Sequence, residues 1–329
     1  MTLRVLQVGD VAGVGRALSM AVAERADIRI DDIEPPTTAA RASPLLKALA
    51  WPVRAARLWW LVRYASRHFQ PDVVHLHWAR YAPFLPRRVP VVVHAHGSDL
   101  RGRRHGRWSL VDRALRRAAV VLVSTPDLLD DAPPGARYLP NAVDIETFRP
   151  PREPPAPGER VLVFARLSEV KGAATIAAAV ATLLARRPSV AVTAFAGGAL
   201  SGDVAAAGAR LRPESADRAA MAELVGGHDV VIGQQRIGAL GLSELEAMAC
   251  GRPVVVALRP EWYPPDLPVV GVPPGDAEAV ADAVDTMIAD VTARQQLGQA
   301  ARSFVEQHHD IDVIAAQLIE IYRQVAARA

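Results

Sequence analysis

The sequence contains a single cysteine, Cys250, so an intrachain disulfide is excluded. Cys250 lies in the run MACG, where we expect a small buried thiol because no histidine stands nearby to activate it. No apolar run reaches the roughly 18 residues that a membrane-spanning helix needs. The first residues enter a strand-like run directly, without the basic and apolar regions of a signal peptide. These absences lead us to expect a cytoplasmic protein.

Aromatic residues are also few, at 5% of 329, but half of all residues are apolar and 22% are charged. This balance is typical of a globular protein, and the length is sufficient for two domains. The charges are uneven: residues 1–150 hold 22 Lys and Arg against 14 Asp and Glu, whereas the remainder holds 16 against 21. A basic first half favours an anionic partner, such as a phosphorylated acceptor or an anionic membrane surface. No nucleic-acid-binding motif accompanies the arginines, so we expect no nucleic acid partner.

Short apolar runs alternate with longer helical patterns along the sequence, as in LRVLQV, VPVVVHAH and RVLVFA. Such strands suit parallel sheets covered on both faces, and the alternation favours a doubly wound α/β architecture. Five prolines in RPPREPPAPGER interrupt the pattern and predict a linker, because proline breaks helices and cannot donate to a sheet. We expect Rossmann-like domains at 1–148 and 160–308, a linker at 149–159, and an amphipathic helix at 309–329 that can cross back to the first domain.

Two cations follow a predicted strand in the second half of the chain. Arg166 and Lys171 lie in FARLSEVKGA, where a Rossmann-like unit presents residues to a ligand. Arginine offers a planar fork and lysine a point charge, so the pair can neutralise a diphosphate. Taken alone, an Arg and a Lys at a strand end are more often solvated surface side chains.

The stretch GALGLSELEAMACGRPVVV at 238–256 predicts a glycine loop, a helix and a turn into a buried strand. Backbone N–H groups at a helix start can bind phosphate. Glu246, one turn further along, can hold sugar hydroxyls, or it can be a carboxylate on a solvated face. Glu244 points about 200° away round the helix, so it is not an obvious substitute.

Two groups of residues raise the question of a metal site. HLHW and VVVHAH place His75, His77, His94 and His96 at two strand ends. No Cys or Glu completes either pair, so we expect structural histidines at the first three positions rather than a zinc site. The run DID at 310–312 opens the last helix, where aspartates are natural first residues. We therefore predict no catalytic metal.

The loop VGDVAGVGRALS follows the first predicted strand and carries three glycines. It lacks the G-x-G-x-x-G fingerprint because Leu18 occupies the third glycine position, which disfavours a nicotinamide dehydrogenase.

Together these motifs resemble the retaining GT-B glycosyltransferases of family four, also called glycosyl transferases group 1. YLPNAVDIETFRP at 138–150 is similar to the family's PNGVD-x-x-x-F segment, with Ala142 in place of glycine, and the resemblance runs from about residue 5 to 325. It implies a GT-B fold with a cleft between the domains. It also implies transfer of a sugar from a UDP- or GDP-sugar to an acceptor hydroxyl with retention, without a cofactor. The acceptor would be a small molecule, a glycan or a lipid-linked molecule, in glycan, glycolipid or glycosylated-metabolite biosynthesis.

The resemblance also implies roles for individual residues. Arg166 and Lys171 would stabilise the departing diphosphate, and His96 would contact the transferred sugar. The implied donor-binding residues are Glu246 at the ribose, with Gly238, Gly241, Leu242, Ser243, Gly15 and Gln235. The implied acceptor-binding residues are Asp99, Arg101 and Gly13.

One position departs from the family pattern. Family members carry another glutamate eight residues before Glu246, and here Gly238 stands there, so the contact with the donor sugar is altered. Gln234 or Gln235 could supply hydrogen bonds instead. The departure keeps two alternatives open: a non-catalytic GT-B protein that binds a nucleotide or a partner, and a phosphorylase or epimerase on the same fold.

The segment 43–69 is rich in Trp and Arg, as in helices that lie on anionic membranes. Projected at 100° per residue, however, Arg54 and Arg57 fall on one side and Arg63 and Arg67 roughly opposite. We therefore expect a core helix that packs its Trp and Leu side chains against the sheet. Peripheral contact with the inner membrane face stays the alternative.

Overall fold

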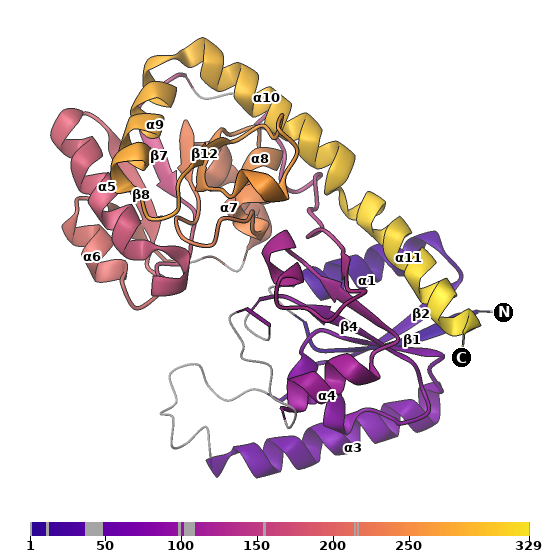
Figure 1. Cartoon of the computed structure of the whole chain (residues 1–329). Helices are drawn as coiled ribbons and strands as arrows, with labels where there is room; N and C mark the ends of the chain where they lie inside the picture. Colours follow the sequence, from indigo (N-terminus) through magenta and orange to yellow (C-terminus); the bar gives the residue numbers. More distant parts are fainter. Residues whose placement is uncertain are drawn as a thin grey trace. The chain divides into compact units, whose positions relative to one another are not determined.

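The computed structural model describes the chain apart from residues 1, 11–12, 37–48, 98–99, 102–108, 154–155, 214, 216 and 329 (Figure 1). The chain divides into two compact units. Unit 1 comprises Met1–Pro140 with Ile311–Ala329, and unit 2 comprises Asn141–Asp310. Each unit has a six-stranded sheet in its described part, and neighbouring strands are parallel. The predicted α/β class with parallel sheets is confirmed.

The sheet of unit 1 has the strand order β2–β1–β3–β4–β5–β6. Its strands are β1 (Leu3–Val8), β2 (Ile28–Ile33), β3 (Val73–Leu76), β4 (Val91–Ala95), β5 (Val120–Val123) and β6 (Arg137–Tyr138). Strands β3, β4 and β5 are buried along their whole length, as apolar runs covered on both faces should be. The order reverses between β1 and β3, and ligands of such sheets bind beyond the carboxyl ends of the strands at the reversal.

The described helices of unit 1 are α1 (Val14–Arg25), α3 (Trp51–Phe69), α4 (Leu110–Arg117) and α11 (Ile311–Ala327). Helix α11 lies along α1, although the two are far apart in the sequence (Figure 1). An ion pair between Arg25 and Asp312 joins them. Tyr322 of α11 reaches the sheet, where its hydroxyl lies 2.6 Å from Nδ1 of His75. The last helix of the chain therefore packs on the first sheet.

Unit 2 has the strand order β12–β11–β10–β7–β8–β9, which is the Rossmann order. Its strands are β7 (Arg160–Val163), β8 (Ala191–Phe195), β9 (Arg210–Arg212), β10 (Val230–Ile232), β11 (Val254–Ala257) and β12 (Val270–Val272). Its helices, in the described residues, are α5 (Ala173–Arg186), α6 (Ser201–Ala206), α7 (Arg218–Gly226), α8 (Leu242–Ala249), α9 (Ala277–Ala289) and α10 (Val291–His308). Here the order reverses between β7 and β10.

The proline-rich stretch at 149–159 lies inside unit 2, and the units divide earlier, after Pro140. A Cβ on Gly226 would lie 3.3 Å from the ring of Pro151, and one on Gly251 would lie 3.3 Å from the ring of Pro150. These prolines therefore pack on the helices of unit 2, so the predicted linker boundaries differ from the observed division.

Helix α3 buries a narrow stripe of side chains. Leu58, Val62 and Ala65 are buried, at the i, i+4, i+7 spacing of one helix face. Trp59 and Trp60 lie outside that stripe and are 49% and 56% exposed. The expectation that the tryptophans of this helix pack against the sheet is therefore wrong for these two.

Candidate functional site

The loops that follow β7 and β10 meet at the strand-order reversal of unit 2. The loop after β7 carries Arg166 and Lys171, and the loop after β10 leads to α8. The Gln235 N–H donates to the Lys171 carbonyl at 2.9 Å. Gly172 has φ +77°, and a Cβ there would lie 2.8 Å from the carbonyl carbon of Gln235, so only glycine lets the loops approach this closely.

Neither Arg166 nor Lys171 forms an ion pair with a described residue, although the Glu244 carboxylate also lies beside Gly241, near Lys171. Arg166 is exposed and Lys171 is half-buried. A Cβ on Gly241 would lie 3.5 Å from Lys171 Nζ, so the ammonium group lies beside the start of α8. The structure therefore brings a cation to a helix N-terminus, which already favours negative charge.

The first turn of α8 is open to a ligand. Gly241 precedes the helix and has no side chain to accept from the first amides. The N–H groups of Leu242 and Ser243 have no acceptor within the helix because of their position. Glu244 instead accepts from the N–H of Gly241 at 2.9 Å and from that of Gln234 at 2.7 Å. Glu244 therefore holds the loop after β10 in place.

Glu246 is buried inside unit 2, so the alternative of a solvated carboxylate is wrong. Its carboxylate pairs with Arg218 of α7, whose guanidinium lies 4.5 Å from the ring centre of Phe148. Burial raises the pKa of Glu246 to about 7, against the lowering effect of Arg218. Arg218 was missed from the sequence, because nothing in the local pattern links residues 28 positions apart.

Gly238 adopts a backbone conformation that other residues rarely reach. Its φ is +83°, and a Cβ there would lie 2.7 Å from Cγ of Arg259. The Gly238 carbonyl also accepts from the Arg259 N–H at 2.9 Å. Local geometry thus requires glycine, whatever contact this position makes with a ligand.

The two glutamines of the loop differ in what they leave available. The side chain of Gln234 donates to the carbonyls of Ala239 and Ala257 and accepts from two backbone N–H groups, so it is fully engaged. Gln235 donates to the carbonyls of Gly233 and Val255, while its Oε1 has no partner among the described residues. The side-chain oxygen of Gln235 can therefore still accept a hydrogen bond, whereas that of Gln234 is already occupied.

In unit 1, Gly15 and His96 both neighbour His77. The Gly15 N–H donates to Asp10 Oδ1 at 2.8 Å, and a Cβ on Gly15 would lie 3.0 Å from His77 Nε2. Nε2 of His96 lies 2.9 Å from His77 Nδ1. Burial lowers the pKa of His96 to about 4, so the ring is neutral at pH 7.

The structure says little about how the residues predicted to bind the acceptor, Gly13, Asp99 and Arg101, would contact a ligand. Gly13 has φ +79° and precedes α1. Arg101 is held by Asp127, with 2.7 Å between Nε and Oδ2. Asp99 lies outside the described residues.

Two Rossmann-like units with parallel sheets are the architecture of the GT-B fold. The family model described as "Glycosyl transferase 4-like domain" matches residues 11–142, and "Glycosyl transferases group 1" matches residues 158–290. The chain therefore belongs to the group 1 glycosyltransferases of family four. No sequence among the curated proteins matches it.

Solved structures share the fold over the full length. Sucrose-phosphate synthase from Thermosynechococcus elongatus is 18% identical, with 99% of this chain and 100% of that chain covered and a TM-score of 0.78. HepE from Anabaena, in complex with UDP-glucose, is 18% identical, with 98% and 100% covered and a TM-score of 0.72. A glycosyltransferase from Rickettsia africae is 14% identical, with both chains fully covered and a TM-score of 0.70.

Proposed function

We propose that the protein transfers a sugar from a UDP- or GDP-sugar to an acceptor hydroxyl with retention of anomeric configuration. The observation that carries the proposal is the Lys171 ammonium group beside the open start of α8, with Arg166 exposed on the same loop after β7. Cationic side chains and backbone N–H groups both favour binding of the diphosphate of a nucleotide sugar. The related fold of HepE holds UDP-glucose, which supports a donor of this class.

In the proposed reaction, the main contribution of these residues is to neutralise the negative charge of the leaving diphosphate. The bond between the anomeric carbon and the phosphate oxygen breaks, and the acceptor hydroxyl forms a new bond to that carbon on the same face. The leaving phosphate takes the hydroxyl proton, so no protein nucleophile and no metal is needed. Arg166, Lys171 and the first amides of α8 stabilise the negative charge that develops on the phosphate.

Other residues hold the rest of the donor. Glu246 binds the ribose hydroxyls, and Arg218 holds its carboxylate in position. Oε1 of Gln235 accepts from a sugar hydroxyl, in place of the glutamate that Gly238 replaces. His96 contacts the transferred sugar as a neutral ring.

Replacing the cations tests the proposal. Arg166→Ala and Lys171→Ala should each lower the rate of transfer about tenfold to 150-fold, because a hydrogen bond to a charged group contributes about 1.5–3 kcal/mol. Transfer is measured as release of UDP or GDP from a panel of nucleotide sugars. Arg186→Ala is the matched control, since Arg186 pairs with Glu278 and Asp282 outside these loops. Unchanged rates in both variants would refute the role of the cations.

The same panel separates the two alternatives. Binding of nucleotide without release from any donor would indicate a non-catalytic protein. Turnover of a sugar phosphate or a nucleotide sugar without any acceptor would indicate a phosphorylase or an epimerase.

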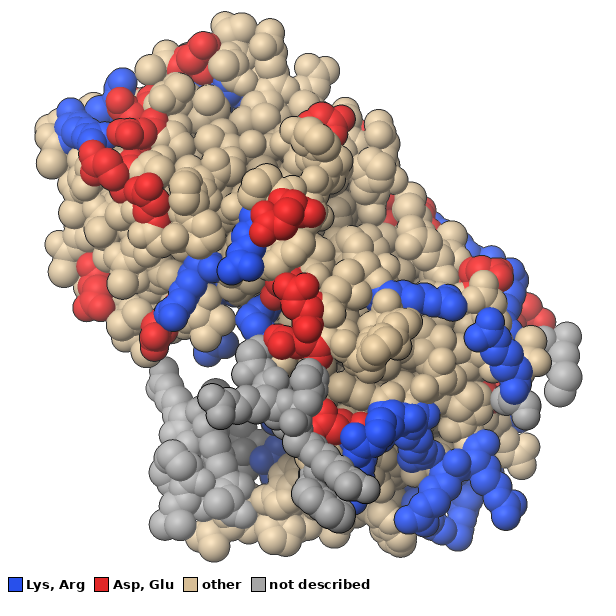
Figure 2. Space-filling model, in the orientation of Figure 1, with Lys and Arg blue, Asp and Glu red and all other residues tan. Residues whose placement is uncertain are grey.

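We also propose that unit 1 contacts an anionic membrane surface through α3. No described helix is long and apolar enough to cross a membrane. The exposed Trp59 lines a cavity of about 720 Å³ in unit 1. The cavity is also lined by Arg63, Arg67, Arg87, Arg88, Arg113 and Arg117. Figure 2 shows arginine side chains gathered over the region of α3 and α4. Exposed tryptophan beside clustered arginine suits an anionic interface.

Vesicle sedimentation tests this contact. Vesicles with anionic lipid should bind the protein, and Trp59→Ser with Trp60→Ser should weaken the binding while neutral vesicles bind neither form. Trp262→Ser, in unit 2, is the matched control. Equal sedimentation of all three forms would contradict the contact.

A further inference from the structure

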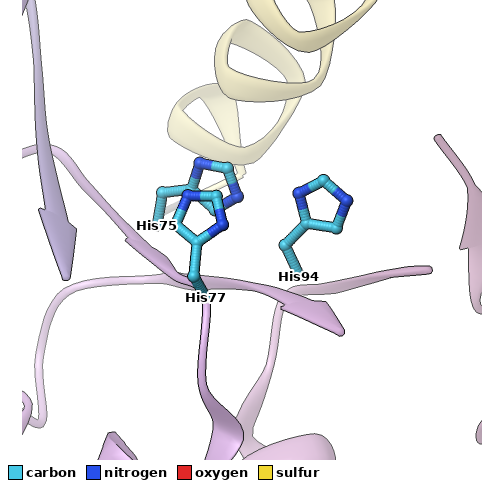
Figure 3. A group of neighbouring side chains, drawn as sticks. All are labelled: His75, His77 and His94. Atoms are coloured by element: carbon cyan, nitrogen blue, oxygen red, sulfur yellow. The ribbon is translucent and has the colours of Figure 1, made fainter. Parts of the chain in front are cut away.

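Four histidines gather at the carboxyl ends of β3 and β4 in unit 1. His75 lies in β3 and His94 in β4, while His77 and His96 lie one residue beyond the ends of these strands. Leu76 pairs with Val93, so the parallel register sets His77 beside His94. Figure 3 shows His75, His77 and His94 on the same side of the strands. Their rings converge because alternate residues of a strand share a face.

The hydrogen bonds of these rings leave several nitrogens without a partner. Nδ1 of His75 bonds to the Tyr322 hydroxyl at 2.6 Å, and Nδ1 of His77 bonds to Nε2 of His96 at 2.9 Å. Nε2 of His75, Nε2 of His77 and both ring nitrogens of His94 are buried without a hydrogen-bond partner among the described residues. Buried polar atoms are normally satisfied, so four orphaned nitrogens in one place require an explanation.

We propose that His75, His77 and His94 bind a divalent transition metal ion, with Zn²⁺ the best match. One ring nitrogen of each lies within 4.8 Å of one from each of the others. Zn–N bonds of about 2.0–2.1 Å in a tetrahedral site need nitrogens about 3.3 Å apart. Small rotations about the side-chain torsions close this difference, and water supplies the fourth ligand.

The surroundings of the rings suit metal ligands. A metal-bound imidazole usually donates its other ring N–H to an acceptor, which fixes the tautomer. The Tyr322 hydroxyl and His96 Nε2 are positioned to act as such acceptors, and in that tautomer Nε2 of His75 and of His77 carries the lone pair.

A negative charge lies near this group. The carboxylate of Asp10 and Nε2 of His77 both line the space that a Cβ on Gly15 would fill, at 2.9 Å and 3.0 Å from it. A cation bound by His77 therefore has a carboxylate close by. The ion would tie the ends of β3 and β4 together near the first turn of α1, which carries Gly15. This role is structural, and no step of the proposed transfer passes through the ion.

Cobalt binding to the whole chain tests the site. The protein is freed of metal with a chelator and titrated with Co²⁺, which gives visible d–d bands in a tetrahedral imidazole site. We expect about one cobalt per chain, displacement by Zn²⁺, and a higher unfolding temperature with either ion. The readout is metal binding alone, so it stands apart from the glycosyltransferase assay.

Two variants and a control complete the test. His94→Gln should abolish the bands. Tyr322→Phe keeps the ring of the tyrosine and should lower cobalt affinity about 10- to 100-fold. His228→Gln should bind like wild type, because this buried histidine lies in unit 2 and bonds to the Leu224 carbonyl. Circular dichroism checks that each variant folds. A wild type without bands, or equal cobalt affinity in wild type and Tyr322→Phe, would overturn the proposal.

Discussion

Replacing Glu246 with glutamine should make the ligand-free protein more stable at alkaline pH. The side chain is 2% exposed, and burial raises its pKa from the ordinary 4.5 to about 7. A raised carboxyl pKa means that the folded state binds more protons than the unfolded one, so stability falls as pH rises from 4.5 to about 7. At about 1.36 kcal/mol per pH unit, the ionised group costs about 3 kcal/mol of folding free energy at pH 8 and about 1 kcal/mol at pH 5.

Urea unfolding of wild type and Glu246→Gln at both pH values measures this difference. We expect the variant to gain about 3 kcal/mol at pH 8 and about 1 kcal/mol at pH 5, because the pKa of about 7 already includes the lowering effect of Arg218. Glu169→Gln is the matched control, because the Glu169 side chain is 84% exposed and its pairing with Arg236 contributes little. The variant should also bind UDP more weakly, since the proposed ribose contact loses its charge. A variant that is less stable than wild type at pH 8 would refute the reasoning.

Two further predictions concern glycines of the donor loops. Gly172→Ala should destabilise the protein by more than about 1 kcal/mol in urea unfolding and reduce UDP affinity, because the Cβ meets the Gln235 carbonyl carbon at 2.8 Å and φ is +77°. Unaltered stability and UDP affinity would contradict this prediction and show that the loops after β7 and β10 can move apart without loss. Gly238→Glu should lower the unfolding midpoint rather than restore a sugar contact, because its Cβ meets Arg259 at 2.7 Å. An equally stable variant with changed donor preference would contradict this expectation.

The fold was predictable because its signals are local. Apolar runs such as VPVVVHAH became buried parallel strands, and the alternation with helical patterns determined the α/β class. The division of the chain was less predictable. Proline disfavours helix interiors and sheets, but whether a proline segment bridges two units depends on what it packs against. Here Pro150 and Pro151 pack on Gly251 and Gly226, and the sequence does not indicate that contact.

The candidate site was predictable to the extent that residues follow strands. Arg166 and Lys171 follow β7 directly, so their place at the strand-order reversal needs only the fold. Arg218 reaches Glu246 from another helix, and such pairing has no sequence signal. The exposure of Trp59 could have been found, because Leu58, Val62 and Ala65 already form the buried stripe and leave no room for it. The arginines on both sides of α3 concealed that pattern.

The central claim, that Lys171 binds the donor diphosphate, can be tested on the lysine itself. Lys47 and Lys171 are the only lysines in the sequence. Reductive ¹³C-methylation keeps the charge of a lysine. In a Lys47→Arg variant, Lys171 is the only lysine that this reaction labels. Adding Lys171→Arg removes its resonance and so distinguishes it from that of the labelled amino terminus. We predict that UDP or GDP shifts the Lys171 resonance saturably, in step with nucleotide binding. A resonance that stays in place while thermal shift reports saturated nucleotide binding would contradict the claim.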